Sequence, residues 1–291
     1  MLTLSKTSME DPVDHWEQKT KLRVLQWQMK VSGNPAATLE SVKNACYRAK
    51  KIQADLLALP EMFCCLYETA KFPEYAEKEG GPLFQACASL ARESGIYLSA
   101  GSMPERAENG SVYNTAYVFD RDGKRIAKHR KMHLFDIDVT GGQTFHESET
   151  LSAGDEVTVF ETEFGKMGLC VCYDFRFPEL GRLMALRGAN LILVPAAFNM
   201  TTGPIHWELM FRAQAMFNQV FVLGTALARD AAADYQSWGH SIAVDPWGVT
   251  LSQMEEQEGG QVIDIDLAEV ERIREQIPLL RHRRTDVYTL I

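Results

Sequence analysis

The stretch that decides the fold of this chain reads GLCVCYDFRFPEL and covers residues 168–180. Its apolar first half favours a buried strand, and Pro178 opens a helical pattern that runs to Gly188. Cys172 therefore lies where a strand passes into a helix. A side chain at such a turn stands clear of the sheet, and we expect the nearby helix start to lower the pKa of the thiol. Cys172 is thus a candidate nucleophile.

The alternative for Cys172 is an ordinary buried thiol, because free cysteine is among the most buried residue types. Cys170 serves as the comparison. It lies two residues earlier on the same predicted strand, without the turn that follows Cys172. We expect Cys170 to belong to the core.

Apolar strands alternate with helices on both sides of this stretch. The predicted strands cover residues 22–29, 55–60, 96–103, 112–119, 125–129, 157–162, 166–172, 191–194, 220–228, 240–245 and 261–265. The predicted helices cover residues 36–53, 83–94, 178–188, 206–218 and 267–276. Residues 131–155 are predicted to be a long irregular stretch, which in a compact domain is usually functional or mobile. The pattern indicates an α/β protein with at least one heavily covered sheet.

Composition excludes several classes of function. The formal net charge of -9 argues against a nucleic-acid surface, which needs a basic face. No apolar run approaches the roughly 18 residues that span a bilayer, and the polar first 21 residues lack the apolar core of a secretory signal. Six cysteines are too few for a disulfide scaffold, and their spacings do not match zinc sites. We therefore expect a cytoplasmic protein without a structural metal, and we interpret the basic run 281–284 as a solvated or interface segment.

A cysteine nucleophile needs a base, and the sequence offers several candidates. Histidine is the usual base, and His133, His206 and His240 are available. Glu61 ends the apolar run of residues 56–60, at the end of a strand where α/β sites gather. A solvated loop position is the alternative for Glu61. Lys131 follows other basic residues and, taken alone, would be part of a solvated face.

Three separated motifs favour a functional role for Glu61 and Lys131 over a solvated position. They read LPE at 59–61, RKMHLFD at 130–136 and CYDFRFPEL at 172–180. In this order they resemble the nitrilase, or carbon–nitrogen hydrolase, superfamily, and the resemblance covers nearly the whole chain after the first twenty or so residues. It implies a single-domain α/β fold, a four-layer α-β-β-α sandwich that assembles as a homodimer or larger homo-oligomer. We expect an N-terminal extension at 1–21, the hydrolase domain at 22–266, and a C-terminal helix and tail at 267–291, at the subunit interface.

The resemblance also implies a catalytic triad of Glu61, Lys131 and Cys172, with Glu147 supporting the lysine. In that chemistry Cys172 attacks an amide carbon, and Glu61 acts first as general base and then as general acid. The Lys131 ammonium and the backbone N–H of Tyr173 would stabilise the oxyanion. Water then cleaves the thioester, and no cofactor is needed.

The runs PAAFNMTTGPIHWE at 195–208 and LFDIDV at 134–139 resemble the omega-amidase branch of this superfamily. That branch implies small substrates, α-ketoglutaramate and α-ketosuccinamate, with a carboxylate far from the amide. Arg176 is a candidate clamp for this carboxylate. The alternative for Arg176 is an ion pair with Asp174 or Glu179. The other candidate substrate-binding residues are Tyr173, Phe198 and Thr202, and packing around a strand end is the alternative for the last two.

Other functions stay open on the same fold. Phe175 and Phe177 suggest an aromatic rim, which leaves the size of the acyl group open. A deaminated-glutathione amidase and an N-carbamoyl-amino-acid hydrolase would use the same triad. A non-enzymatic binding protein is the alternative from another class, because a fold alone does not prove activity. A Cys172→Ala variant separates the two classes, because only turnover depends on the thiol.

Overall fold

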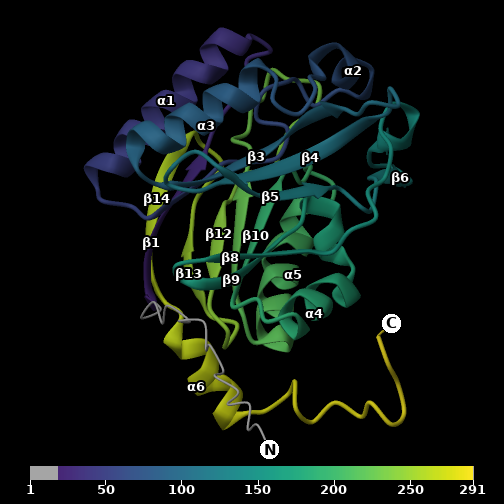
Figure 1. The fold of residues 1–291 in the computed structure, drawn as a ribbon. Coiled ribbons are helices and arrows are strands. Elements are labelled where there is room, and N and C mark those ends of the chain that lie inside the picture. The colour runs from purple at the N-terminus through teal and green to yellow at the C-terminus, as the bar shows by residue number, and fades with distance from the viewer. Residues whose placement is uncertain (1–18, 291) are drawn as a thin grey trace, which may run out of the picture.

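The protein is built around two six-stranded β-sheets that face each other, as the computed structural model of residues 19–290 shows (Figure 1). The first sheet has the order β14-β1-β2-β3-β4-β5. Its strands are β1 (Lys21–Gln28), β2 (Leu56–Ala58), β3 (Tyr97–Arg106), β4 (Val112–Phe119), β5 (Arg125–Arg130) and β14 (Gly259–Asp266). Of the predicted N-terminal extension, residues 1–18 lie outside the described part, and Lys21 already belongs to β1.

The second sheet has the order β13-β12-β11-β10-β9-β8. Its strands are β8 (Thr158–Thr162), β9 (Gly165–Leu169), β10 (Leu191–Ala196), β11 (Phe221–Ala226), β12 (Ile242–Val244) and β13 (Thr250–Gln253). In each sheet three neighbouring strands are parallel, β1-β2-β3 in the first and β9-β10-β11 in the second. The remaining pairs are antiparallel. Parallel strands are usually covered on both faces, and β2, β10 and β11 are buried along their whole length.

Helices cover the outer face of each sheet (Figure 1). The longer helices are α1 (Pro35–Lys51), α3 (Pro82–Ser94), α4 (Pro178–Leu186), α5 (Gly203–Asn218) and α6 (Ala268–Gln276). Shorter helices are α2 (Phe72–Tyr75) and the 3₁₀ turns η1 (Thr69–Lys71), η2 (Glu147–Glu149) and η3 (Cys172–Arg176). One apolar cluster joins α1 and α3 to the first sheet, and a second joins both sheets to α4 and α5. The predicted α-β-β-α sandwich is thus confirmed.

Local sequence explains where these helices begin and end. Asn34 caps α1, since its Oδ1 accepts hydrogen bonds from the backbone N–H groups of Ala36 and Ala37. Helix α3 ends at Gly95, whose φ of 68° is a left-handed value that glycine tolerates. Pro178 occupies the first turn of α4, as the sequence predicts.

Short strands account for the main differences from the sequence prediction. The segment predicted to be irregular contains a hairpin of β6 (Asp136–Asp138) and β7 (Thr144–His146), with three residues in each strand. The edge strand β13 was not predicted either. Such strands are too short to show a reliable alternation of apolar and polar residues. The strand before Cys172 ends at Leu169, so Cys172 itself opens the 3₁₀ turn η3.

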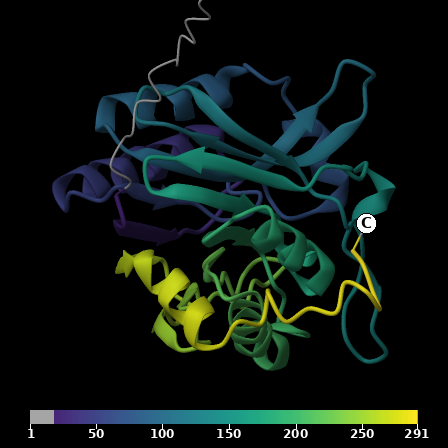
Figure 2. The ribbon, with the colours of Figure 1, turned by 60° about the horizontal axis from the view of Figure 1, so that its bottom comes forward.

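The chain beyond α6 runs as an extended tail along the outside of the molecule (Figure 2). Leu280 is partly buried and packs against the cluster that joins both sheets to α4 and α5, whereas Val287 and Tyr288 are exposed. Most of the basic run 281–284 is also exposed. None of the helices in residues 19–290 has the length and apolar character needed to cross a membrane.

Candidate active site

The predicted site residues meet where the carboxyl ends of strands from both sheets come together. Glu61 lies shortly after β2, and Lys131 comes directly after β5. Cys172 follows β9 in the opposite sheet, and Glu147 opens η2 directly after the hairpin strand β7. The ends of parallel strands are the usual place for sites in α/β proteins.

Lys131 joins two carboxylates in the interior. Its Nζ lies 2.9 Å from Oε1 of Glu61 and 2.9 Å from Oε1 of Glu147. All three side chains are fully buried. Burial opposes a charged ammonium, but the two carboxylates outweigh it and hold the pKa of Lys131 above its ordinary value. Lys131 is therefore a fixed positive charge inside the protein.

Neutral donors orient the two carboxylates. Asn114 Nδ2 donates to Oε1 of Glu61 at 2.8 Å. The hydroxyl of Tyr67 donates to Oε1 of Glu147 at 2.8 Å, and the backbone N–H of Phe135 donates to its Oε2 at 2.8 Å. Oε2 of Glu61 is buried and receives no hydrogen bond from the described residues. That oxygen is left to accept a proton.

Cys172 lies close to the Glu61 carboxylate. Its backbone has a left-handed φ of 48°, and its side chain is near enough to the Glu61 carboxylate and to the backbone N–H of Ala197 for both groups to affect the pKa of the thiol. Left-handed backbone at a bulky residue is a strained conformation that tends to occur at functional sites. Cys170 is buried in the core, as predicted.

The expectation that a helix start lowers the thiol pKa is wrong. Burial, reinforced by the Glu61 carboxylate, raises the pKa of Cys172 well above its ordinary value, and Lys131 only partly opposes this. The physical reason is position, because α4 begins at Pro178, six residues after Cys172. The thiol is therefore protonated at neutral pH and needs a base.

Asp174 connects the chain segments that carry Lys131 and Cys172. Its Oδ2 accepts from His129 Nε2 at 2.9 Å and from the backbone N–H of Val171 at 3.0 Å. Its Oδ1 accepts from the backbone N–H groups of Met132 and His133, at 3.0 and 2.8 Å, and from His133 Nδ1 at 2.8 Å. Burial would raise the pKa of this carboxyl, but the histidine donors lower it. Asp174 thus spans the two sheets behind the site.

A tight contact under Glu61 fixes the position of its backbone. Gly101 in β3 has a φ of 57°, and a Cβ there would lie 2.0 Å from the carbonyl oxygen of Pro60. Ser102 Oγ accepts from the backbone N–H of Met62 at 3.0 Å, and Ser102 N–H donates to the carbonyl of Pro60 at 3.2 Å. Only glycine allows the strand to approach this closely.

Arg176 makes neither of the ion pairs considered as its alternative. Asp174 is occupied by the histidines, and no carboxylate in residues 19–290 pairs with Arg176. Its Nη1 instead donates to His206 Nδ1 at 2.9 Å. The guanidinium lies 4.5 Å from the ring centre of Phe198, and its Nε is buried with no partner in the described part. The guanidinium also lies 5.8 Å from the ring centre of Tyr173, the residue that follows Cys172, which places Arg176 beside the segment that carries the thiol.

The remaining substrate-binding candidates occupy different places. Tyr173 is half-buried against Phe135, with ring centres 5.1 Å apart. Phe198 lies under Arg176. The backbone N–H and hydroxyl of Thr202 both donate to Asn199 Oδ1 at 3.0 Å, so Thr202 closes the turn before α5.

Only part of the expected aromatic rim is present. Phe175 is fully buried and packs against Phe211, with ring centres 5.2 Å apart, so it belongs to the core. Phe177 stacks on His133, with ring centres 3.7 Å apart. Tyr235 was not expected from any sequence motif. Its ring centre lies 4.4 Å from that of Tyr67, and its hydroxyl donates a hydrogen bond to the carbonyl of Ala197.

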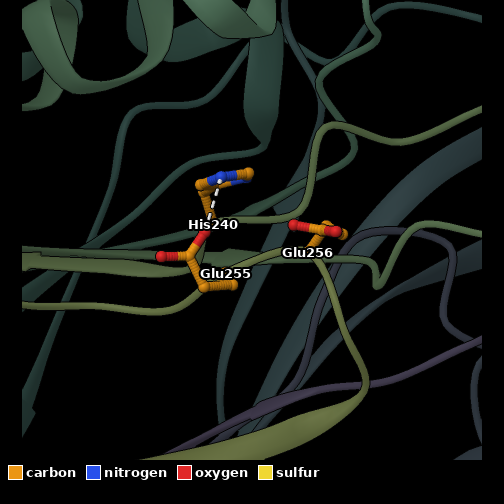
Figure 3. Close-up of side chains that lie close together, drawn as sticks. All are labelled: His240, Glu255 and Glu256. Atoms are coloured by element: carbon orange, nitrogen blue, oxygen red, sulfur yellow. Dashed lines mark ion pairs between the residues drawn. The ribbon is translucent and has the colours of Figure 1, made fainter.

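The three histidines considered as bases are hydrogen-bonded to other groups. His133 contacts Asp174, His206 contacts Arg176, and His240 Nδ1 lies 2.8 Å from the carbonyl of Trp238. Figure 3 shows His240 beside Glu255, 3.6 Å from Nε2 to Oε2, with Glu256 nearby. This group could reach one cation, but Glu255 is exposed, and we assign no metal to it.

Comparison with known proteins agrees with the family that the sequence motifs resemble. Residues 21–275 match the family model described as carbon-nitrogen hydrolase. The chain is 48% identical to omega-amidase NIT2 of Mus musculus over 263 residues, which cover 90% of this chain and 95% of that protein. It is 44% identical to omega-amidase NIT2 of Homo sapiens, over 93% of this chain and 98% of that protein.

Solved structures agree with this match. The crystal structure of Saccharomyces cerevisiae Nit3, a member of the nitrilase superfamily, is 38% identical with a TM-score of 0.84. The alignment covers 91% of this chain and 97% of that one. The C. elegans NitFhit protein is 33% identical with a TM-score of 0.86, over 93% of this chain and 67% of the other.

Proposed function

Because the chain belongs to the carbon-nitrogen hydrolase family, we propose that it hydrolyses the terminal amide of a small dicarboxylic acid monoamide to the acid and ammonia. The chain is an amidase of the nitrilase superfamily and acts on non-peptide carbon–nitrogen bonds. The proposal adds the substrate class, which is of the α-ketoglutaramate and α-ketosuccinamate type. The names of the omega-amidase relatives support this choice.

Arg176 is the observation that carries the proposed substrate. A partly buried guanidinium near the thiol, with no carboxylate partner in the described residues, is costly unless a ligand supplies the counter-charge. Its free N–H groups can hold a carboxylate in bidentate geometry. A small monoamide with a distal carboxylate would place its amide at Cys172 and its charge at Arg176.

The proposed first half-reaction forms a thioester. Glu61 takes the thiol proton of Cys172 while the sulphur attacks the amide carbon. The Lys131 ammonium and the backbone N–H of Tyr173 stabilise the resulting oxyanion, and one such donor is worth on the order of 10²–10³-fold in rate. Glu61 then donates its proton to the departing nitrogen, so ammonia leaves and the C–N bond breaks.

The proposed second half-reaction reverses the roles of Glu61. Glu61 removes a proton from water as the water oxygen attacks the thioester carbon. The C–S bond breaks, the acid is released, and the proton returns to the Cys172 sulphur. Glu147 holds Lys131 in place throughout, which is supported by their 2.9 Å contact.

Ammonia release decides between this substrate class and its alternatives. We would compare α-ketoglutaramate with deaminated glutathione and a carbamoyl amino acid, using Cys172→Ala as the blank. A kcat/KM at least ~10-fold higher for α-ketoglutaramate, about 1.4 kcal/mol in transition-state binding, is expected. A preference for either of the other substrates would change the proposed substrate class without affecting the proposed triad. Turnover by Cys172→Ala would refute the triad.

We also propose that the protein forms a homodimer or larger homo-oligomer. Apolar side chains on α5 are exposed in the single chain, with Ile205 at 72% and Leu209 at 68%. Exposed apolar patches of this kind mark interfaces. The tail at 267–291, with exposed Val287 and Tyr288, would contribute to the interface. Leu209→Glu should lower the mass measured by light scattering, and an unchanged mass would exclude this face.

We further propose a cytoplasmic location. All six cysteines lie in the described part of the chain, and all are free and buried. A reducing compartment preserves free thiols, including the one that the proposed mechanism needs. Fluorescence microscopy of the tagged full chain tests this, and an organellar signal would contradict it.

A further inference from the structure

The contact between Arg176 and His206 defines the protonation of the imidazole. A guanidinium only donates hydrogen bonds, so Nδ1 of His206 must be the acceptor in the 2.9 Å contact. The imidazole is therefore neutral, with its proton on Nε2. Burial and the Arg176 charge both lower the pKa of His206, which favours this neutral form.

His206 provides the only polar contact to the Arg176 guanidinium among residues 19–290. The other contacts come from ring faces, with Phe198 at 4.5 Å and Tyr173 at 5.8 Å. Ring faces limit how far a guanidinium moves but leave its rotation in the plane free. The hydrogen bond to His206 fixes that rotation and leaves the remaining N–H groups of the fork free.

The backbone of His206 is itself held firmly. It lies in the first turn of α5, where its N–H donates to the carbonyl of Thr202 at 2.9 Å. The next residue, Trp207, is buried and donates through Nε1 to the carbonyl of His240 at 2.7 Å. A Cβ on Gly203 would lie 2.4 Å from Trp238, so this end of the helix is packed closely. The backbone of His206 is thus fixed, and its exposed side chain reaches Arg176 from this position.

The neutrality of His206 matters as much as its position. An Asp or Glu at this place would orient Arg176 equally well, but it would neutralise the guanidinium and compete with a substrate carboxylate. A neutral acceptor orients the guanidinium and leaves its positive charge available. This combination fits a site built to receive an anion.

We propose that His206 is a positioning residue that sets the specificity for anionic substrates by orienting Arg176 with a neutral acceptor. The inference rests on the proposed function, in which Arg176 binds the distal carboxylate of the substrate. It predicts that His206 acts on substrate binding and not on the chemical step, because His206 does not touch the proposed reacting atoms.

Two pairs of substitutions at position 206 test this. His206→Asn keeps an acceptor close to the place of Nδ1, whereas His206→Leu removes it. We expect KM for α-ketoglutaramate to rise at least ~10-fold in His206→Leu with kcat nearly unchanged, and His206→Asn to restore most of the loss. His206→Gln, whose acceptor lies further out, should restore less. His206→Glu should also raise KM, because it neutralises Arg176.

A neutral amide and the Arg176→Ala variant provide the controls. Butyramide has no carboxylate, so its kcat/KM should be the same in the wild type and in His206→Leu. In an Arg176→Ala background, His206→Leu should have no further effect on α-ketoglutaramate. Circular dichroism melting curves check that each variant is folded, and His206→Asn serves as a second folded variant.

The outcomes separate the two proposals. If Arg176→Ala loses α-ketoglutaramate activity but His206→Leu does not, the role of His206 is refuted and the proposed function stands. If His206→Leu and His206→Asn are equally impaired, or if butyramide is affected equally, His206 has only a structural role. If Arg176→Ala has no effect on the anionic substrate, both proposals fall.

Discussion

Asp174 Oδ2 and His129 Nε2 lie 2.9 Å apart, and both side chains are fully buried between the two sheets. The same carboxylate accepts hydrogen bonds from the chain on both sides of the site, at Val171 and at Met132. The positions of Lys131 and Cys172 relative to each other therefore depend on one side chain. Asp174 touches none of the proposed reacting atoms, so its role is positioning.

We predict that Asp174→Asn destabilises the protein and slows turnover. An amide can accept on its oxygen only, so its NH₂ group would face buried donors. Breaking a buried network of this kind costs about 3–5 kcal/mol. We expect a loss of this size in the free energy of unfolding from urea titration, and a kcat at least ~10-fold lower in the folded fraction.

Asp120→Asn is the matched control for Asp174→Asn. Asp120 Oδ1 accepts from the backbone N–H groups of Asp122 and Lys124 in a surface turn, and an Asn oxygen can accept both. This control should change the free energy of unfolding by less than about 0.5 kcal/mol. An Asp174→Asn variant with the stability and kcat of the wild type would show that the network does not position the site.

We predict that Glu61→Gln slows alkylation of Cys172 at neutral pH. Burial is the largest cause of the raised thiol pKa and persists in this variant, although the Glu61 charge no longer adds to it. The thiol therefore stays protonated at pH 7 and has lost the base that takes its proton. The rate of labelling by iodoacetamide, followed by mass spectrometry, should fall at least ~10-fold in Glu61→Gln at pH 7. It should rise with pH in this variant, because a raised pKa leaves the thiolate fraction still increasing above pH 9.

Cys170 is the internal control for this labelling. It lies two residues from Cys172, is fully buried, and also has a thiol pKa raised by burial. We expect it to stay unlabelled under conditions that modify Cys172. Equal labelling rates for Cys172 in the wild type and in Glu61→Gln between pH 6 and 8 would indicate a preformed thiolate and exclude Glu61 as its base.

The sequence was informative where the position of a side chain follows from a local pattern. Glu61 and Cys172 each follow an apolar strand, and this placement is visible in a window of a few residues. Asn114 and Tyr67 are different, because they lie 53 and 80 residues from the carboxylates that they contact. Asn114 is one polar residue within a strand, and no local signal separates it from an ordinary cross-strand position.

The error about the Cys172 pKa has a similar origin. The motif shows Pro178 close in sequence, and a helix start so near suggested an electropositive surrounding. The 3₁₀ turn η3 separates the two residues in space, and burial between two sheets determines the pKa instead. Burial of this kind depends on the packing of both sheets, which the composition of one segment does not encode.

We predict that Gly101→Ala displaces Glu61. The added Cβ would lie 2.0 Å from the carbonyl oxygen of Pro60, so the turn that carries Glu61 must shift. We expect kcat to fall at least ~10-fold, because misplacement of a catalytic group by about 1 Å can cost about 10²-fold. The measurement is ammonia release under saturating substrate, with melting curves to confirm the fold.

Gly110→Ala is the matched control for Gly101→Ala. Gly110 also has a left-handed φ, 87°, but a Cβ there would meet nothing within 4 Å. It should therefore show only the backbone strain, of order 1 kcal/mol in stability, with kcat unchanged. If the two variants lose kcat equally, the contact with Pro60 does not position Glu61.

We predict that Glu105 supports the end of β5, and hence Lys131, in a pH-dependent way. Glu105 lies 2.6 Å from Lys128 Nζ and 2.8 Å from Arg130 Nη2, with Thr115 Oγ1 donating at 2.7 Å. Burial alone would raise its pKa, but the hydrogen bonds from Arg130, Lys128 and Thr115 lower the pKa of Glu105 to about 2. A carboxyl with a lowered pKa stabilises the fold above its unfolded pKa of about 4.3, and this stabilisation is lost as pH falls toward 2.

Glu105→Gln should therefore lower the free energy of unfolding by roughly 2–3 kcal/mol at pH 7. The difference from the wild type should shrink steadily as urea titrations are repeated from pH 5 to pH 3, because the unfolded wild-type chain takes up a proton on Glu105 over that range while the folded chain does not. Glu108→Gln removes an exposed ion pair with Lys78 and should change stability by less than about 1 kcal/mol at any pH. A Glu105→Gln deficit that stays constant with pH would mean that side-chain packing, and not the charge of Glu105, holds β5 in place.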